Sequence, residues 1–387
     1  MGAERTQRIE TLAVHSGGRR PGPEGSVVFP IYQGTVYTYD PGTDYHDLKY
    51  LRLSSTPSQR YLHDKLAALE GAEAALAASS GMAAITTTLL TFLKQGDHLL
   101  VADTLYGGTH DFVTEHSHEV GFSYTFVDPG RPESWAEALR PTTRLFYVET
   151  ITNPLMRVAP LRKVAAFARE HKLVSAVDNT FASPVNCRPL DLGFDLSLHS
   201  ATKYLNGHSD LVAGCVLGSR TLVDRVRRML NHLGGTLDPH AGYLLARGLK
   251  TLALRVRANN RNGEALSGFL AAHPKVAHVN YPGLPAHPDH AVARDVLSGF
   301  GGMLSFRLGG GLDAVKRLFG ALTIPYVAVS LGGVETLVTR PATTSHAGMR
   351  REDRERLGIT DDLVRVSCGI EHPDDLIEDF RQALERA

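Results

Sequence analysis

Short apolar runs alternate with amphipathic segments between about residues 60 and 200, and this alternation restricts the fold more than any other feature of the sequence. The apolar runs, rich in Val, Leu and Phe, occur at 99–103, 123–128, 144–149, 173–178 and 194–200. Helical patterns lie between them at 64–77, 82–94, 107–119, 132–140 and 159–171. Strands of continuous apolar character are buried on both faces, as in parallel sheets covered by helices. The sequence therefore predicts an α/β fold with a large, mostly parallel sheet.

The stretch 71–93 is long enough to be compared with a membrane-spanning helix, because Glu73 is its only charged residue. Ser79, Ser80 and three consecutive threonines at 86–88 interrupt it, so it lacks the continuous apolar length that a bilayer requires. We expect a buried helix of a large α/β protein at this position.

The regions on either side of the alternating segment have different patterns. Residues 1–60 are rich in Gly, Pro and Tyr without a sustained period, which favours an extended arm that contacts a neighbouring subunit. Residues 61–249 form the expected large domain, and 250–387 form a smaller C-terminal α+β domain. For that smaller domain we expect helices at 251–272, 312–322 and 374–385 and strands at 278–284, 303–308 and 363–369.

Composition excludes several classes of function. The chain has 387 residues with 41 basic and 41 acidic side chains, so no electrostatic footprint indicates nucleic acid or an anionic membrane as a partner. Three cysteines without a C-x-x-C pair cannot form a disulfide framework, which favours a reducing, cytoplasmic location. The charged start of the sequence at 1–5 lacks the apolar core of a secretory signal.

Polar residues stand at the ends of four of the five predicted strands, all except the one at 123–128. In parallel α/β sheets, ligands bind beyond the carboxyl ends of the strands, so these positions predict the place of a site. The residues, in chain order, are Asp103 and Tyr106, Glu149 and Asn153, Asp178 and Thr180, and Ser200 and Lys203.

The most informative stretch is DLSLHSATKYLNGHS at 195–209. It places Lys203 directly after a buried strand, between the hydroxyls of Ser200 and Thr202 and the apolar residues that follow. A desolvated lysine amine has a lowered pKa and can act as a nucleophile that forms a Schiff base. Taken alone, a lysine in a loop is more often an ordinary structural residue.

The whole stretch resembles the lysine signature of the Cys/Met-metabolism family of pyridoxal-phosphate enzymes, which includes cystathionine synthases and lyases and methionine γ-lyase. The resemblance extends from the region of Tyr50 to GIE at 369–371. It implies the aspartate-aminotransferase-like fold (fold type I), with a seven-stranded large domain and pyridoxal 5'-phosphate as cofactor. It further implies an α-amino acid as substrate and a homotetramer built from two dimers with shared active sites.

The resemblance assigns roles around the cofactor. Lys203 would carry it, Asp178 in AVDNTFASP would pair with its ring nitrogen, and Tyr106 in DTLYGGT would stack on its ring. By themselves, such an aspartate is equally typical of a helix N-cap and such a tyrosine of packing. The phosphate would lie against four residues at the start of a helix and in the lysine loop. These are Gly81, Met82, Ser200 and Thr202.

A second group of residues would complete the site. Tyr50 and Arg52, in KYLRLSSTPS, resemble a pair that reaches the phosphate from the neighbouring subunit, so that a monomer would have no complete site. Arg365, in LVRVSCGIE, would bind the substrate carboxylate bidentately, although alone it could form an edge-strand ion pair. Ser330 and Asn153 would complete the carboxylate and cofactor contacts, and Glu149 would have a structural role near the ring.

Departures from the family pattern bear on the substrate. Where cystathionine γ-lyases and γ-synthases commonly carry glutamates, this sequence has Lys49 and Val329, which suit an apolar thioether better than a distal ammonium. Gly108 replaces a cysteine that is frequent in methionine γ-lyases, and one extra residue separates Arg52 from Pro57 relative to the common form. We expect a carbon–sulfur lyase that performs α,γ-elimination on methionine-like substrates. Cystathionine γ- or β-lyase activity and γ-replacement by a synthase or sulfhydrylase are the alternatives.

Two further motifs resemble ligand-binding sequences but are better explained as ordinary structure. His116 and His118 form an H-x-H without further ligands at metal spacing, so no metal site is predicted. GFGGM at 299–303 resembles a nucleotide loop but precedes a strand, so we interpret it as a turn. A non-catalytic relative of the family is disfavoured because every expected catalytic position is filled.

Overall fold

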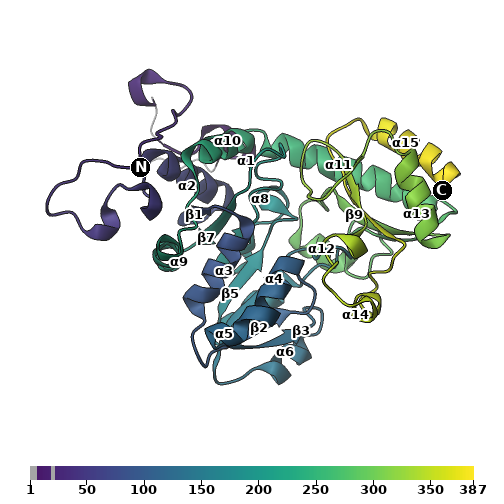
Figure 1. Ribbon diagram of the computed structural model, residues 1–387, viewed down its shortest axis with the longest axis horizontal. Coiled ribbons are helices and arrows are strands. Elements are labelled where there is room, and N and C mark those ends of the chain that lie inside the picture. Colours follow the sequence, from purple (N-terminus) through teal and green to yellow (C-terminus); the bar gives the residue numbers. More distant parts are fainter. Residues whose placement is uncertain (1–6, 19–21) are drawn as a thin grey trace.

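The computed structural model describes residues 7–18 and 22–387, and the charged segment at 1–5 lies outside this part. Figure 1 shows a larger unit next to a C-terminal unit, with an N-terminal segment that projects at the far left. Each unit is built on its own sheet, of seven strands in the larger unit and five in the C-terminal unit.

The seven-stranded sheet has the order β1-β7-β6-β5-β4-β2-β3. Strand β7 is antiparallel to both of its neighbours, and the other strand pairs are parallel. Every residue of β2 and of β7 is buried, as expected for a sheet covered on both faces. The prediction of a mostly parallel α/β sheet is therefore confirmed. The strands are β1 (Ala74–Ala78), β2 (His98–Ala102), β3 (Ser123–Val127), β4 (Thr143–Glu149), β5 (Val174–Asp178), β6 (Leu196–His199) and β7 (Gly214–Gly218).

The predictions of a helix at 64–77 and of one buried helix across 71–93 are wrong. Helix α2 (Pro57–Glu70) ends before the predicted 77, because Gly71 takes the left-handed conformation with φ +74°. Strand β1 follows and pairs with β7, and α3 (Gly81–Phe92) begins only after Ser80, whose hydroxyl caps it. An alanine-rich run has no period that separates strand from helix, so only the pairing with β7 decides between them.

The remaining helical predictions in this unit are confirmed to within a few residues, except that 107–119 is divided. There, α4 (Gly107–Asp111) and α5 (Ser117–Val120) are joined by a π-helical turn at Phe112–His116. The other helices of the larger unit are α6 (Pro132–Ala138), α7 (Leu161–Glu170), α8 (Ser183–Asn186), α9 (Arg220–Leu233) and α10 (Pro239–Leu249).

The C-terminal unit has a mixed sheet with the order β10-β11-β12-β9-β8, antiparallel except between β10 and β11. Phe306, Val364 and Phe380 are fully buried between this sheet and its helices. The elements are α11 (Leu252–Ala272), β8 (Val276–Asn280), α12 (His290–Val296), β9 (Met303–Leu308), α13 (Gly311–Ala321), β10 (Tyr326–Val327), β11 (Leu337–Thr339), α14 (Arg351–Arg356), β12 (Leu363–Ser367) and α15 (Pro373–Arg386).

The long helix α11 belongs to both units. It packs against α8 of the larger unit and against β8, β9 and α15 of the smaller one. Figure 1 shows it crossing from one unit to the other. The N-terminal segment is irregular apart from α1 (Ile9–His15), which packs on α2 and α11, and short helical turns. Val27 and Val36 in this segment are 98% and 76% exposed.

Candidate active site

Lys203 lies in the loop that follows β6, at the carboxyl edge of the large sheet. The loop is a tight turn in which the Lys203 N–H donates to the Ser200 carbonyl and the Gly207 N–H donates to the Lys203 carbonyl, at 3.1 and 2.8 Å. The amine Nζ donates to Ser330 Oγ at 2.8 Å. Because Ser330 belongs to the C-terminal unit, the lysine points into the junction between the two units.

The pKa of the Lys203 amine is lowered from 10.5 to about 8, mainly by burial and also by the positive charge of Arg365. A lysine with a pKa of about 8 is neutral in a useful fraction of molecules near neutral pH. The neutral amine is both a nucleophile and a proton acceptor. The expectation of a desolvated amine at this position is thus matched by the geometry and by the direction of the shift.

Arg365 lies in β12 and is 5% exposed. Its Nη1 donates to Asn153 Oδ1 at 3.0 Å and its Nη2 donates to the Ser330 carbonyl at 2.9 Å. Among the described residues its Nε is buried without an acceptor. Burial lowers the pKa of the guanidinium to about 10. A buried guanidinium whose partners are all neutral is arranged to receive an anion such as a carboxylate.

Asp178 ends β5, directly beside Glu149 at the end of β4, to which it is paired in register. Burial raises the pKa of both carboxyl groups, and the charge of Asp178 raises that of Glu149 further. The Thr180 N–H donates to Asp178 Oδ1 at 2.9 Å, which favours the ionised form of that aspartate. Two buried carboxyl groups side by side favour a cationic group against them, because burial of unpaired charge is costly.

Tyr106 follows β2 and caps the start of α4. Its backbone N–H donates to Glu149 Oε1 at 2.6 Å, so Glu149 holds the tyrosine loop in place, in agreement with its expected structural role. The side chain of Tyr106 is 45% exposed. A Cβ at Gly108 would lie 2.8 Å from the Tyr106 ring and 3.1 Å from Met82 Sδ. The absence of a side chain at 108 therefore allows these two side chains to approach each other.

The start of α3 lies against the lysine loop. A Cβ at Gly81 would lie 2.8 Å from Ser200 Cβ and 3.0 Å from Ser200 Oγ, so only glycine permits this approach. The N–H groups of Gly81 and Met82 have no acceptor in the described part of the chain. Free N–H groups at a helix start, next to the Ser200 hydroxyl, are suited to an anion. By contrast, the Thr202 hydroxyl is already bonded to both backbone groups of Ala213, at 3.1 and 3.0 Å.

Tyr50 and Arg52 are bonded to a different part of the chain. Arg52 donates to the Asn231 carbonyl at 3.1 Å and to Tyr45 Oη at 2.9 Å, and its guanidinium lies 5.7 Å from the Tyr50 ring centroid. Asn231 is near the end of α9. Tyr50 is 39% exposed. Within one chain, these hydrogen bonds connect Arg52 to its own arm and to α9 rather than to Lys203, Arg365 or Asp178.

The sequence matches the profile described as Cys/Met metabolism PLP-dependent enzyme over residues 10–385. The chain belongs to this family. It is 42% identical over 377 residues to a cystathionine gamma-lyase of Bacillus subtilis, with 97% of this chain and 99% of the relative covered. It is 41% identical over 395 residues to an L-methionine gamma-lyase of Pseudomonas putida, with 99% of each chain covered.

The solved structures agree with this assignment. A cystathionine gamma synthase from Xanthomonas oryzae pv. oryzae, in complex with aminoacrylate and cysteine, superposes with a TM-score of 0.94 at 39% identity and covers 98% of each chain. The expected fold class is confirmed, and the chain is a pyridoxal-phosphate-dependent enzyme of sulfur amino acid metabolism. Relatives with different reactions are almost equally similar, so overall identity does not select one of those reactions.

Pyridoxal 5'-phosphate is the cofactor of the family, and the residues of this chain fit it. Gly81 leaves room at a helix start with free N–H groups, as a phosphate requires. Burial raises the pKa of Asp178 and of Glu149, and a protonated ring nitrogen would supply a positive charge beside these two carboxyl groups. Lys203 has the lowered pKa that covalent attachment needs. The unpartnered Nε of Arg365 is suited to the carboxylate of an amino acid.

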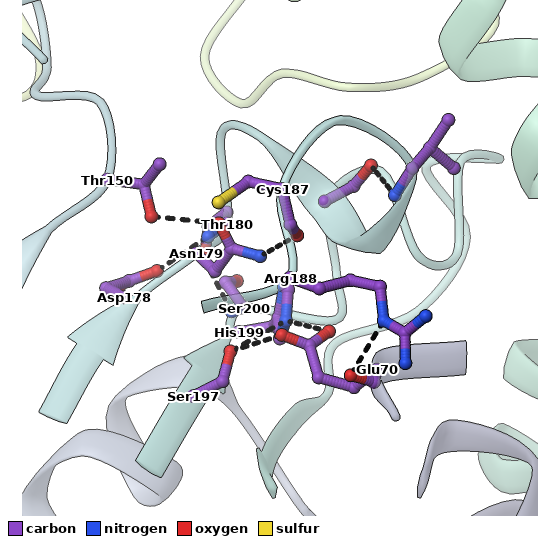
Figure 2. A network of polar contacts seen from close by, with 12 residues as sticks. Glu70, Thr150, Asp178, Asn179, Thr180, Cys187, Arg188, Ser197, His199 and Ser200 are labelled. Atoms are coloured by element: carbon purple, nitrogen blue, oxygen red, sulfur yellow. Dashed lines mark hydrogen bonds and ion pairs between the residues drawn. The ribbon is translucent and has the colours of Figure 1, made fainter. Parts of the chain in front are cut away.

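Thr180 is a site residue whose role the sequence did not reveal. Figure 2 shows it between Asp178 and Ser200: its N–H donates to the aspartate, and its hydroxyl accepts the Ser200 N–H at 2.8 Å. It therefore ties the end of β5 to the lysine loop. The strand-end position of Thr180 was the available signal, but a strand end alone does not specify which neighbour is bonded.

A buried polar network under the sheet was also missed. Glu70 accepts a hydrogen bond from Ser197 Oγ at 2.6 Å and pairs with His199 Nε2 at 3.2 Å, as Figure 2 shows. All three side chains are at most 2% exposed. Ser197 and His199 alternate within an otherwise apolar strand, which was a signal for a polar partner behind that strand. Nothing in the sequence indicated that the partner is the last residue of α2.

No group of His, Cys, Asp or Glu in residues 7–18 and 22–387 is arranged to hold a metal ion. Over the same residues, none of the helices has both the length and the apolar character needed to cross a membrane. Cys187, Cys215 and Cys368 are buried as free thiols. His116 pairs with Glu119 on an exposed surface, in line with the interpretation of a solvated helix end.

Proposed function

We propose that this enzyme is a carbon–sulfur lyase that performs α,γ-elimination on methionine-like amino acids and yields an α-keto acid, ammonia and a thiol. The observation that carries the proposal is the contact chain from Lys203 Nζ to Ser330 Oγ and from the Ser330 carbonyl to Arg365 Nη2, at 2.8 and 2.9 Å. A substrate carboxylate on Arg365 would place its α-carbon near the lysine amine. A proton acceptor must lie within such reach of the carbon it acts on.

The residues divide the work as follows. Arg365 binds the substrate carboxylate, with Asn153 and Ser330 orienting the guanidinium. Lys203 would accept the α-proton, and only after releasing it could the neutral amine accept a second proton, from Cβ. Tyr106 would donate a proton to the departing thiolate. Asp178 would keep a ring nitrogen protonated. Gly81, Met82 and Ser200 would hold the phosphate, with Thr202 beside them in the same loop, its hydroxyl bonded to Ala213. The bound cofactor supplies an electron sink for the carbanion.

The preference for a methionine-like substrate rests on two residues. Val329 is next to Ser330 in sequence and 64% exposed, so it offers an apolar wall without a carboxylate. Lys49 is exposed next to Tyr50, and a lysine there opposes a distal ammonium by about 1 kcal/mol. Gly108 weakens this preference because it lacks the thiol that often packs over the substrate in methionine γ-lyases.

Cleavage of cystathionine is the second candidate, because a cystathionine gamma-lyase is among the most similar relatives. A synthase or sulfhydrylase that replaces the γ-substituent of an acyl-homoserine would use the same core residues. The purified enzyme should be incubated separately with methionine, cystathionine, cysteine and homocysteine, and keto acid should be measured. Preference for cystathionine by more than tenfold would overturn the methionine assignment. A new thioether formed from an acyl-homoserine and added thiol would identify the replacement reaction.

We further propose that the enzyme is a cytoplasmic homotetramer, a dimer of dimers with shared active sites. Exposed apolar residues on the N-terminal segment, among them Val27 and Val36, support an additional surface against which this segment packs. In this proposal residues 1–60 form the intersubunit arm, 61–249 the cofactor domain and 250–387 the C-terminal domain. Light scattering at several concentrations tests the assembly, and a stable monomer with full activity would contradict it.

A further inference from the structure

Helix α11 carries a row of buried polar residues that hold backbone carbonyls of other elements. Arg255, Asn259 and Asn262 are spaced by four and three residues, so they lie in a row on the helix, about 10 Å from first to last. Each is at most 3% exposed. Burial of such side chains is costly, and here their N–H donors are bonded while Oδ1 of Asn259 and of Asn262 has no partner among the described residues. The acceptors of the N–H groups show which backbone segments the row holds.

Arg255 holds the backbone directly after the catalytic lysine. Its Nη1 donates to the Tyr204 carbonyl at 2.7 Å, and its Nη2 donates to the carbonyls of Leu205 and Gly248 at 3.4 and 2.8 Å. Its Nε donates to Thr251 Oγ1 at 3.0 Å. Tyr204 is the residue that follows Lys203. The guanidinium therefore joins the lysine loop to the end of α10 and the start of α11.

The hydrogen bonds that Arg255 donates require the planar shape of a guanidinium. Its acceptors are neutral carbonyls and a hydroxyl, spread around a planar fork that an ammonium group cannot reproduce. A Cβ at Gly207 would lie 1.8 Å from Arg255 Nη1, and Gly207 has φ +74°, so the loop is shaped closely around this side chain. Burial lowers the pKa of Arg255 to about 10.

The other two residues hold the backbone that follows Arg365. Asn259 Nδ2 donates to the carbonyls of Cys368 and Gly369 at 2.7 and 3.0 Å. Asn262 Nδ2 donates to the carbonyls of Gly369 and Glu371 at 3.1 and 2.8 Å. Gly369 is four residues after Arg365 and two residues beyond the end of β12. One helix thus fixes the loop of the proposed proton acceptor at one end of the row and the strand of the proposed carboxylate ligand at the other.

The loop at 330–336 closes the connection between these two backbones. Gly332 donates its N–H to Ser367 Oγ at 2.9 Å, and a Cβ at Gly332 would lie 2.7 Å from the Tyr204 nitrogen. The loop therefore touches both β12 and the residue after Lys203. Its Ser330 bonds to both Lys203 and Arg365.

We propose that Arg255, Asn259 and Asn262 are positioning residues that set the distance between Lys203 and Arg365 through α11. This inference rests on the proposed function, because it takes Lys203 as the proton acceptor and Arg365 as the carboxylate ligand. A shift of about 1 Å between such groups can lower a rate by about a hundredfold. Through this row, α11 holds the loop of Lys203 and the segment after Arg365 at a fixed separation, although the two units are built on separate sheets.

The two ends of the row have different expected effects. Arg255→Lys loosens the lysine loop and leaves β12 in place, so kcat should fall at least tenfold while KM stays within twofold. In the same variant, covalent capture of added pyridoxal phosphate by Lys203, trapped with borohydride and detected by mass spectrometry, should slow at least fivefold. Asn259→Ser loosens the strand of Arg365, so KM for the best substrate of the panel should rise at least fivefold with capture unchanged.

Arg257→Lys is the matched control, because it makes the same change two residues away on the same helix at a side chain that is 54% exposed and pairs with Glu10. It should change neither capture nor kinetics by more than twofold. If Arg255→Lys does not fold, Thr251→Val replaces it, since this change removes the acceptor of Arg255 Nε, and a threefold loss of kcat is then expected.

The proposal is overturned if both end variants alter kcat and KM by the same factor, or if neither changes either constant, while thermal unfolding shows folded protein. An absence of capture in the wild-type enzyme would instead refute the proposed function. Normal capture in the wild type with unchanged variants would refute only the role of the row.

Discussion

The residues of the candidate active site fall into two groups that differ in burial and in the elements to which they are hydrogen-bonded. Lys203 and Asp178 lie at the carboxyl edge of the large sheet and Arg365 lies in β12, and all three are buried or partly buried. Ser330 joins Lys203 to Arg365 through hydrogen bonds of 2.8 and 2.9 Å. The pair Tyr50 and Arg52 lies on an irregular segment and is bonded to Tyr45 and α9. The first group is built by the fold of one chain. In the proposed assembly, the second group acts at the site of a neighbouring subunit.

The difference in burial between the two groups indicates how such a site is assembled. Buried groups with displaced pKa values must be fixed by surrounding secondary structure, because their desolvation is too costly in a flexible segment. A cation that reaches a phosphate from outside needs only a positive charge and length, so an irregular arm is sufficient. The following predictions test this division, beginning with the largest effect.

Mixing two inactive variants should restore activity. We expect Lys203→Ala to lower kcat about 10³-fold or more through loss of the proton acceptor, and Arg52→Ala to be severely impaired. If Arg52 serves the neighbouring subunit, half of randomly mixed dimers are hybrids with one intact site of two, so activity should return to about a quarter of wild type. Steady-state assays before and after co-refolding measure the recovery.

Each variant refolded alone is the control, and differently tagged chains report whether hybrids have formed. Absence of recovery in demonstrated hybrids would place Arg52 in the site of its own chain and remove the contrast between the two groups.

Arg365→Lys should raise KM about thirtyfold with a smaller effect on kcat. Lysine keeps the charge but cannot hold a carboxylate bidentately, and a charged hydrogen bond contributes about 1.5–3 kcal/mol. Initial rates over a range of substrate concentrations give both constants. Arg307→Lys on the neighbouring strand β9, where the arginine pairs with Asp362, is the control and should leave KM within twofold. A KM unchanged in Arg365→Lys would refute its role in binding the substrate.

The apoprotein should become more stable when the lysine amine is removed. Burial places the folded-state pKa of Lys203 at about 8, below its unfolded value of 10.5. Between these values the unfolded chain binds more protons, so wild-type stability rises with pH there. At pH 7 Lys203→Met should unfold with a free energy up to about 3 kcal/mol larger than wild type, and this difference should disappear between pH 8 and 10.5.

Urea unfolding of both apoproteins at several pH values measures the difference. Lys94→Met, at an exposed position, provides the background for losing a lysine. A constant difference between Lys203→Met and wild type across this pH range would show that Lys203 is not desolvated.

Gly81→Ala should weaken cofactor binding about tenfold, the smallest of these effects. The new methyl group would lie within 3.0 Å of Ser200 and would have to displace the lysine loop from the start of α3. A tenfold loss corresponds to about 1.4 kcal/mol. Fluorescence titration of apoprotein with pyridoxal phosphate gives the affinity. Gly320→Ala in α13, where a Cβ meets no atom within 4 Å, should bind as wild type does. Equal affinities for both variants would remove the phosphate from this place.

Periodicity was sufficient wherever a strand or helix is buried on a regular pattern. Strands β2 to β6 and the long helices α11 and α15 lie within a few residues of their predicted positions. The Ala-rich run at 74–78 was assigned to a helix because small apolar residues suit both structures, and its pairing with β7 involves residues about 140 positions away. Local patterns do not contain such partners.

The expected site residues show the same division. Lys203, Ser330, Arg365 and Asn153 are connected by hydrogen bonds in the structure, while their assigned roles stay predictions. The Thr202 hydroxyl, expected near a phosphate, is bonded to Ala213. The sequence does not distinguish Arg255, because a buried basic residue in a long helix with polar neighbours has the same local pattern as one on the solvent side.

The sequence alone determined the α/β class, the carboxyl edge of the sheet as the place of the site, and the family, because these depend on period and on short motifs. Only the tertiary structure decided which polar groups meet. The row on α11 and the pairing of Glu149 with Asp178 each join residues far apart in the chain. Within residues 7–18 and 22–387, Nε of Arg365 is buried without an acceptor. The energetics of these groups depend on burial and distance, which exist only once the chain has folded.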